Sequence, residues 1–136
     1  MGLFEGQVAW VTGAGRGIGR AVALALAEQG AAVALVSRTQ SEVEQAADEI
    51  RARGGTAIAS LLDVSNWDMV KWTAQQIEAA LGSITMLINN AGVLDPLGKV
   101  WETDPEQAGR LFGINLSGAY YCMRAVLPGM VQRGQG

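Results

Sequence analysis

The segment TGAGRGIG, at residues 12–19, constrains the fold of this chain more than any other part of the sequence. An apolar run at Val8–Val11 precedes the segment and predicts a short buried strand. Apolar residues at helical spacing follow it from Gly17 to Gln29 and predict a helix. A glycine-rich turn between a strand and a helix is typical of a dinucleotide-binding unit.

Three glycines of this turn have separate expected roles. Gly13 permits a tight turn, Gly17 lets a phosphate approach the backbone, and Gly19 lets the helix pack closely on the strand. The free N–H groups and the positive dipole at the start of the helix attract a pyrophosphate. The turn therefore predicts where the phosphates of a nucleotide bind.

Further apolar runs predict buried strands at residues 31–37, 56–62 and 86–90. Helical patterns separate these runs, and capping sequences place helix starts at Ser41 and Ser65. The runs are apolar throughout rather than alternating, so we expect helices on both faces of a parallel sheet. With right-handed crossovers, the sequence predicts a doubly wound α/β fold of the Rossmann type.

The last predicted helix begins after Asp104, which we expect to cap it, with Pro105 at the first helical position. The helical pattern continues to about Arg133, and Pro128 predicts a kink or a stop within it. Beyond the fourth strand no further strand is predicted, so we expect that strand to form an open edge of the sheet. An uncovered apolar edge favours association, and we expect a homo-oligomer.

Composition excludes several classes of function. The net charge is −3 with scattered arginines, which argues against a nucleic-acid partner. No apolar run approaches 18 residues, and the N-terminus lacks the pattern of a signal peptide, so we expect no membrane partner. Cys122 is the single cysteine, which fits a cytoplasmic location. The chain has no histidine, which excludes Ser-His nucleophiles and the usual zinc ligands, and we expect no metal.

The end of the second predicted strand indicates which nucleotide binds. A mononucleotide P-loop needs a lysine that the glycine turn lacks, and a methyl-donor site usually has an acid at this strand end. An NAD site also tends to place an acid there, but Ser37 and Arg38 stand in its place. Arg38, Ser37 and Arg16 of the glycine turn suit a 2′-phosphate, unless both arginines are only solvated surface residues. The sequence favours NADP(H) over NAD(H).

Four motifs in order resemble those of the short-chain dehydrogenases/reductases. They are the T-G-x-x-x-G-I-G turn, the pair Asp63-Val64, the NNAG sequence at 89–92, and Asn115 within GINLSG. The resemblance covers essentially the whole chain and implies one NAD(P)-binding domain at residues 1–136, truncated relative to the family. It does not separate the sugar-reducing, carbonyl-reducing and 3-oxoacyl-reducing members, so the substrate class stays open.

The resemblance also implies roles for matching positions. Asp63 would bind the adenine amino group with Val64 beside the ring, and Ile18 would lie near the nicotinamide. Asn115 would bend its helix, and its carbonyl would hold a water in a proton relay. An NNAG sequence that only caps the fourth strand is the structural alternative. The predicted cofactor-binding residues are Gly13, Gly15, Arg16, Gly17, Ile18, Gly19, Ser37, Arg38, Asp63, Val64, Asn90, Ala91 and Gly92, and the predicted catalytic residue is Asn115.

The family further implies a serine and a Tyr-x-x-x-Lys sequence beyond a fifth strand, and the 136 residues contain neither arrangement. Tyr120 followed by Arg124 imitates that spacing, but we expect Tyr120 and Tyr121 only to pack a helix away from the nicotinamide. The sequence thus predicts the cofactor-binding half of an NADP(H)-dependent reductase acting on a carbonyl or alcohol, inactive by itself. A non-catalytic nucleotide-binding or assembly protein and a complete enzyme seen in part are the alternatives.

Overall fold

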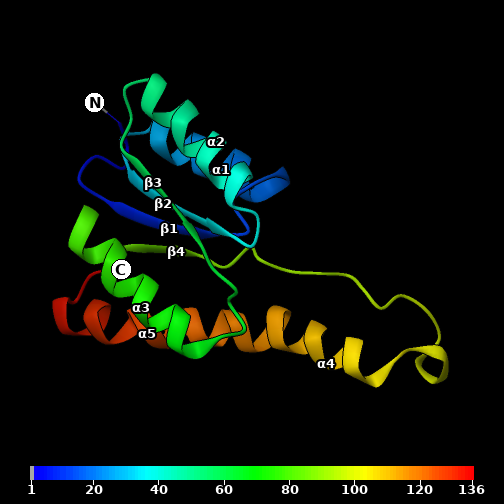
Figure 1. The fold of residues 1–136 in the computed structure, drawn as a ribbon. Coiled ribbons are helices and arrows are strands. Elements are labelled where there is room, and N and C mark those ends of the chain that lie inside the picture. The colour runs from blue at the N-terminus through cyan, green and yellow to red at the C-terminus, as the bar shows by residue number, and fades with distance from the viewer. Residues whose placement is uncertain (1) are drawn as a thin grey trace.

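The computed structural model describes residues 2–136 and contains one parallel sheet of four strands (Figure 1). The strand order is β3-β2-β1-β4, and β1 pairs in parallel with both β2 and β4. This arrangement confirms the predicted doubly wound α/β fold. The strands are β1 (Val8–Thr12), β2 (Ala32–Ser37), β3 (Ala57–Leu61) and β4 (Met86–Ile88).

Helices cover both faces of the sheet, with α1 and α2 on one side and α3 and α5 on the other (Figure 1). After β4 the chain runs out in a long loop before α4, which leads through a π-helical segment, η2, into α5. The helices are α1 (Gly17–Glu28), α2 (Gln40–Ala52), α3 (Trp67–Leu81), η1 (Val100–Glu102), α4 (Pro105–Phe112), η2 (Gly113–Gly118) and α5 (Ala119–Arg133).

Each face of the sheet has its own apolar core, as uninterrupted apolar strands predict. Along β1, Val8 and Trp10 point into the core beneath α3 and α5. The alternate residues Ala9 and Val11 point into the core beneath α1 and α2. Because successive side chains of a strand point to opposite faces, a strand buried on both sides is apolar along most of its length, and in β1 only Thr12 at the carboxyl end is polar. All five residues of β1 are accordingly buried.

Two predicted helix starts are displaced by one or two residues. Helix α2 begins at Gln40 after Thr39, so Ser41 lies inside the helix and is not its cap. At α3 the cap is Asn66 rather than Ser65, and the Asn66 side chain accepts a hydrogen bond from the Met69 N–H at 3.1 Å. Several side chains near a helix start can form the same local bond, and the path of the preceding loop decides between them.

The predicted start of α4 is confirmed, because the Asp104 carboxylate accepts a hydrogen bond from the Glu106 N–H at 3.3 Å and Pro105 is the first helical residue. Of the predicted kink or stop at Pro128, the stop is wrong, because α5 continues through this residue to Arg133, where the helical pattern was predicted to end. Pro128 lies on the exposed side of α5, where solvent can satisfy the carbonyl that loses its helical partner.

The outer edge of β4 is open within residues 2–136, as the sequence predicts. An apolar groove of about 580 Å³ runs between this edge and α5. Met86 and Ile88 of β4 form one side of it, and Met123 and Leu127 of α5 form the other. Apolar side chains of β4 and α5 therefore remain exposed along this edge of the sheet.

Candidate functional site

A cavity of about 380 Å³ lies at the carboxyl ends of the strands. The glycine turn, the ends of β2 and β3 and the segment after β4 contribute to its wall, as expected for a parallel sheet at the point where the strand order reverses. Of the predicted cofactor-binding residues, all except Gly19 line it. The lining residues that the sequence analysis missed are Val36, Thr39, Glu42, Leu62, Val93 and Ile114.

The backbone of the glycine turn explains its composition. Gly13 and Gly17 have φ angles of 61° and 58°, a left-handed conformation that residues with a side chain rarely adopt. Gly19 lies outside the cavity because it faces the protein: a Cβ there would overlap the Gly13 carbonyl oxygen and the Asn90 side-chain nitrogen. Gly19 therefore permits close packing of α1, as predicted, without lining the cavity.

The start of α1 suits a pyrophosphate. Arg16 occupies the capping position, and no side chain caps the helix there. The first turn of α1 contains no acidic residue that would repel an anion. Uncapped N–H groups at the start of a 12-residue helix, beside glycines that leave the backbone accessible, are typical of sites that bind anions. This part of the cavity fits the cofactor that the sequence predicts.

Asn90 connects the end of β4 to the glycine turn. Its side-chain amide donates hydrogen bonds to the carbonyls of Thr12 and Gly13, each at 3.1 Å. In return, the Thr12 hydroxyl oxygen accepts hydrogen bonds from the N–H groups of Asn90 and Ala91, each at 3.0 Å. The structural alternative for the NNAG sequence thus applies to Asn90, although Asn90, Ala91 and Gly92 also line the cavity. Thr12, whose contribution the sequence analysis missed, is buried beneath the turn.

Asp63 and Val64 follow β3 and are held in place locally. One oxygen of the Asp63 carboxylate accepts hydrogen bonds from the Ser65 N–H at 3.0 Å and from the Ser65 hydroxyl at 2.6 Å. Val64 packs against Gly118, where a Cβ would come within 2.5 Å of the valine Cγ2. The second Asp63 oxygen has no hydrogen-bond partner within residues 2–136, so it is available to a ligand.

Asn115 lies in η2, so its helix does depart from regular α geometry at the predicted place. Its side chain does not line the cavity. It forms two hydrogen bonds of 2.7 Å with Val93, accepting from the backbone N–H and donating to the carbonyl. Asn115 therefore fastens the segment after β4 to η2, and a Cβ on Gly92 would lie 3.3 Å from its side-chain oxygen.

The two adjacent tyrosines lie on α5, and neither lines the cavity. The Tyr121 ring packs on Trp67 with 5.6 Å between ring centroids, as expected of a packing residue. The Tyr120 ring packs on Tyr121 with 5.9 Å between ring centroids, although Tyr120 remains 57% exposed. It forms an apolar surface with Met123 and Leu127 on the outer side of the helix.

The sequence associates Ser37, Arg38 and Arg16 with a 2′-phosphate. Ser37 and Arg38 lie at the end of β2, and Arg16 lies in the glycine turn. Ser37 is held by Thr39, whose N–H donates to the serine hydroxyl oxygen at 3.1 Å. Arg16 and Arg38 are exposed and form no ion pair within the described residues. Glu42 also lines this end of the cavity. Glu42 was not predicted from the sequence, because it lies five residues after Ser37, in the first turn of the next helix.

Residues 2–136 contain no group of three or more potential metal-ligating side chains. In the same part of the chain, none of the helices combines the length and the apolar character that crossing a membrane requires.

Relatives of the chain include oxidoreductases. It is 39% identical over 134 residues to "Uncharacterized oxidoreductase YxbG" of Bacillus subtilis, and the match covers 98% of this chain and 49% of the relative. It is 38% identical to "Ketoacyl reductase HetN" of a Nostoc species, covering all of this chain and 47% of that protein. The chain thus spans about half the length of the curated relatives it matches.

Solved structures that resemble this chain are also oxidoreductases. A metagenomic short-chain oxidoreductase in complex with NADP superposes with a TM-score of 0.93 at 38% identity, over 98% of this chain and 60% of that one. An NAD+-bound xylitol dehydrogenase superposes with a TM-score of 0.94 at 34% identity, over 98% and 52%. The sequence profile described as "short chain dehydrogenase" matches residues 7–136. The fold, the cavity and these matches together place the chain in the short chain dehydrogenase family.

Proposed function

We propose that this chain binds NADP(H) in preference to NAD(H) in the cavity at the carboxyl ends of the strands. The observation that carries the proposal is a pair of exposed, unpaired guanidinium groups that line the cavity with Ser37: Arg16 of the glycine turn and Arg38 at the end of β2. Guanidinium groups bind phosphate through charge-assisted hydrogen bonds. Relatives of known structure include both an NADP complex and an NAD+ complex, so family membership alone leaves the preference open.

The remaining lining residues receive the rest of the cofactor in this proposal. The uncapped start of α1 holds the pyrophosphate, and Gly13, Gly15 and Gly17 leave room for it. The free oxygen of Asp63 accepts a hydrogen bond from the adenine amino group, beside Val64. Asn90, Ala91 and Gly92 line the central ribose, and Ile18 lies near the nicotinamide.

The reaction that we propose for the protein is hydride transfer between the nicotinamide and a small-molecule carbonyl or alcohol. When bound, the cofactor would supply the hydride to a carbonyl or accept it from an alcohol, and this chain would bind and orient the cofactor. The backbone carbonyl of Asn115 holds a water of the proton relay, while its side chain keeps η2 fastened to Val93. Within residues 2–136 neither tyrosine lines the cavity, so we expect negligible reductase activity from these residues alone. We propose a cytoplasmic location.

Replacing Arg38 tests the cofactor preference. In Arg38→Asp the charge-assisted hydrogen bonds to the 2′-phosphate are lost and a repelling carboxylate is added. We expect the NADPH affinity to fall about 10- to 100-fold, equivalent to about 1.5–3 kcal/mol, while the NADH affinity holds or rises. Calorimetric titration of both nucleotides measures this change. Arg124→Asp makes the same charge change on α5, outside the cavity, and serves as the matched control.

An unchanged ratio of the NADPH and NADH affinities in Arg38→Asp would contradict the proposed preference. If neither nucleotide binds to the wild-type chain, the glycine turn serves only as scaffolding. The alternative of a non-catalytic assembly protein then gains support.

We also propose that the chain forms homo-oligomers through the apolar surface exposed on α5 and along the edge of β4. Large exposed apolar patches on soluble proteins mark sites of association. A concentration-independent monomer in sedimentation equilibrium would be incompatible with this proposal.

A further inference from the structure

Glu42 carries a carboxylate into the cavity from the first turn of α2. Side chains of a helix lean toward its N-terminus, so a residue in the first turn leans back toward the end of the preceding strand. Glu42 accordingly lines the cavity together with Ser37, Arg38 and Thr39. An acidic group thus reaches the end of β2 without being adjacent to that strand in the sequence.

The position of the carboxylate is defined by its contact with the glycine turn. A Cβ built on Gly15 would lie 2.8 Å from both the Cβ and the Oε2 of Glu42, and 3.1 Å from the Ser37 hydroxyl oxygen. The Glu42 side chain therefore lies directly against the backbone of the turn, next to the serine at the end of β2. It occupies space that any side chain at position 15 would need.

The Glu42 carboxylate is half-buried and, within residues 2–136, forms no hydrogen bond and no ion pair. Glu44, two positions further along α2, differs because its carboxylate accepts a hydrogen bond from the Gln40 amide at 3.1 Å. The Glu42 carboxylate oxygens remain accessible to solvent, so a ligand in the cavity can reach them. Glu42 is thus an acceptor facing the same end of the cavity as Arg16 and Arg38.

We propose that Glu42 is a second determinant of cofactor preference and that it opposes the two arginines. Its carboxylate repels a 2′-phosphate and accepts a hydrogen bond from a ribose 2′-hydroxyl. The consequence is a preference for NADP(H) that is smaller than Arg16 and Arg38 alone would produce, with NAD(H) binding retained. The proposal rests on the function proposed above and adds the residue that limits its selectivity.

Adenosine 2′,5′-bisphosphate and adenosine 5′-monophosphate isolate the relevant half of the nucleotide, because they differ only in the 2′-phosphate. Calorimetry gives the ratio of their affinities for the wild-type chain and for Glu42→Gln. Removing one like charge from the same end of the cavity should raise this ratio about three- to tenfold in favour of the bisphosphate. The increase should shrink as the salt concentration rises.

Glu44→Gln is the matched control, because it makes the same change on the same helix outside the cavity and should leave the ratio unchanged. Glu42→Ala, which also removes the charge, should shift the ratio in the same direction, and it replaces Glu42→Gln if circular dichroism shows that variant unfolded. A ratio that is unchanged or lower in the folded Glu42 variants overturns the role of Glu42 while leaving nucleotide binding intact. Binding of neither compound to the wild-type chain overturns the nucleotide site itself and, with it, the role of Glu42.

Discussion

Gly19 lies at the start of α1, where its Cα faces the Gly13 carbonyl and the Asn90 side-chain amide. The backbone conformation at this position is one that any residue adopts, so the requirement for glycine comes from space alone. Gly13 and Gly17 differ, because their positive φ angles require glycine whatever the space around them. A single glycine-rich turn thus combines two physical requirements that look identical in the sequence.

Gly19→Ala should therefore destabilise the fold, because the new methyl group must displace the Gly13 carbonyl of the glycine turn and the Asn90 amide. We expect the free energy of unfolding to fall by about 1–3 kcal/mol in urea denaturation. Gly109→Ala in α4 makes the same chemical change where no atom lies within 4 Å of the new Cβ. There we expect a gain of about 0.5–1 kcal/mol from the higher helix propensity of alanine. Equal effects at both positions would contradict this explanation.

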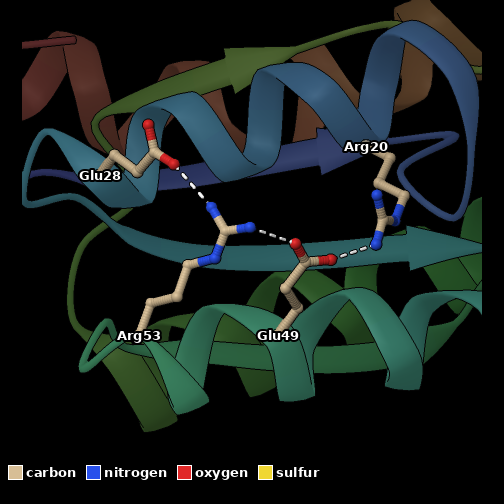
Figure 2. A network of polar contacts seen from close by, with 4 residues as sticks. All are labelled: Arg20, Glu28, Glu49 and Arg53. Carbon is tan, nitrogen blue, oxygen red and sulfur yellow. Dashed lines mark hydrogen bonds and ion pairs between the residues drawn. The ribbon is translucent and has the colours of Figure 1, made fainter.

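At the scale of elements, α1 and α2 are joined by a chain of ion pairs across the face of the sheet (Figure 2). Glu49 of α2 pairs with Arg20 of α1 and, at 2.5 Å, with Arg53. Arg53 pairs in turn with Glu28 at the end of α1, at 2.7 Å. The carboxylate of Glu49 holds two guanidinium groups and is the central member of this chain.

Glu49→Gln should lower the free energy of unfolding by about 1 kcal/mol at low salt, because it weakens two partly exposed ion pairs at once. Higher salt should reduce the difference from wild type, since screening already weakens both pairs. Asp48 precedes Glu49 in the sequence and forms a single exposed ion pair with Arg51. Asp48→Asn removes this pair and should change the free energy of unfolding by less than about 0.5 kcal/mol. Urea denaturation at two salt concentrations measures both variants.

At the scale of the whole molecule, Cys122 reports whether α5 is packed on the sheet. Its side chain is fully buried in the core that contains Trp10 and Ile77. Burial raises the pKa of the Cys122 thiol to about 12, because the thiolate would lose its hydration there. The thiol therefore stays neutral and unreactive as long as the fold is intact.

The pKa of an unfolded cysteine is about 8.5, below that of Cys122 in the fold. The unfolded chain therefore ionises first as the pH rises, and stability that is present below about pH 8.5 is lost between there and about pH 12. The loss approaches about 1.4 kcal/mol per pH unit. Comparison with Cys122→Ala isolates it, because other groups titrate equally in both proteins. Rapid alkylation of Cys122 by iodoacetamide at pH 8 without denaturant would contradict the buried position.

The sequence predicted the sheet, its helices and most residues of the cavity because these depend on local patterns. Apolar runs, helical spacing and the conformational freedom of Gly13 and Gly17 act within a few residues. The predicted helix caps Ser41 and Ser65 are wrong for a local reason too, since neighbouring residues compete to accept the hydrogen bond from the first turn of the helix. Asp104 and Pro105 were identified because two independent signals coincide there.

By itself, the sequence determined the fold class and the position of the cavity at the carboxyl ends of the strands. The tertiary structure decided what individual residues do in it, because those roles arise between segments far apart along the chain. The Thr12–Asn90 bonds join residues 78 positions apart, and the Asn115–Val93 bonds join residues 22 apart. No local pattern encodes such contacts. The approach of Glu42 to Gly15 is of the same kind, since a helix turn and a glycine turn meet only once β1 and β2 pair.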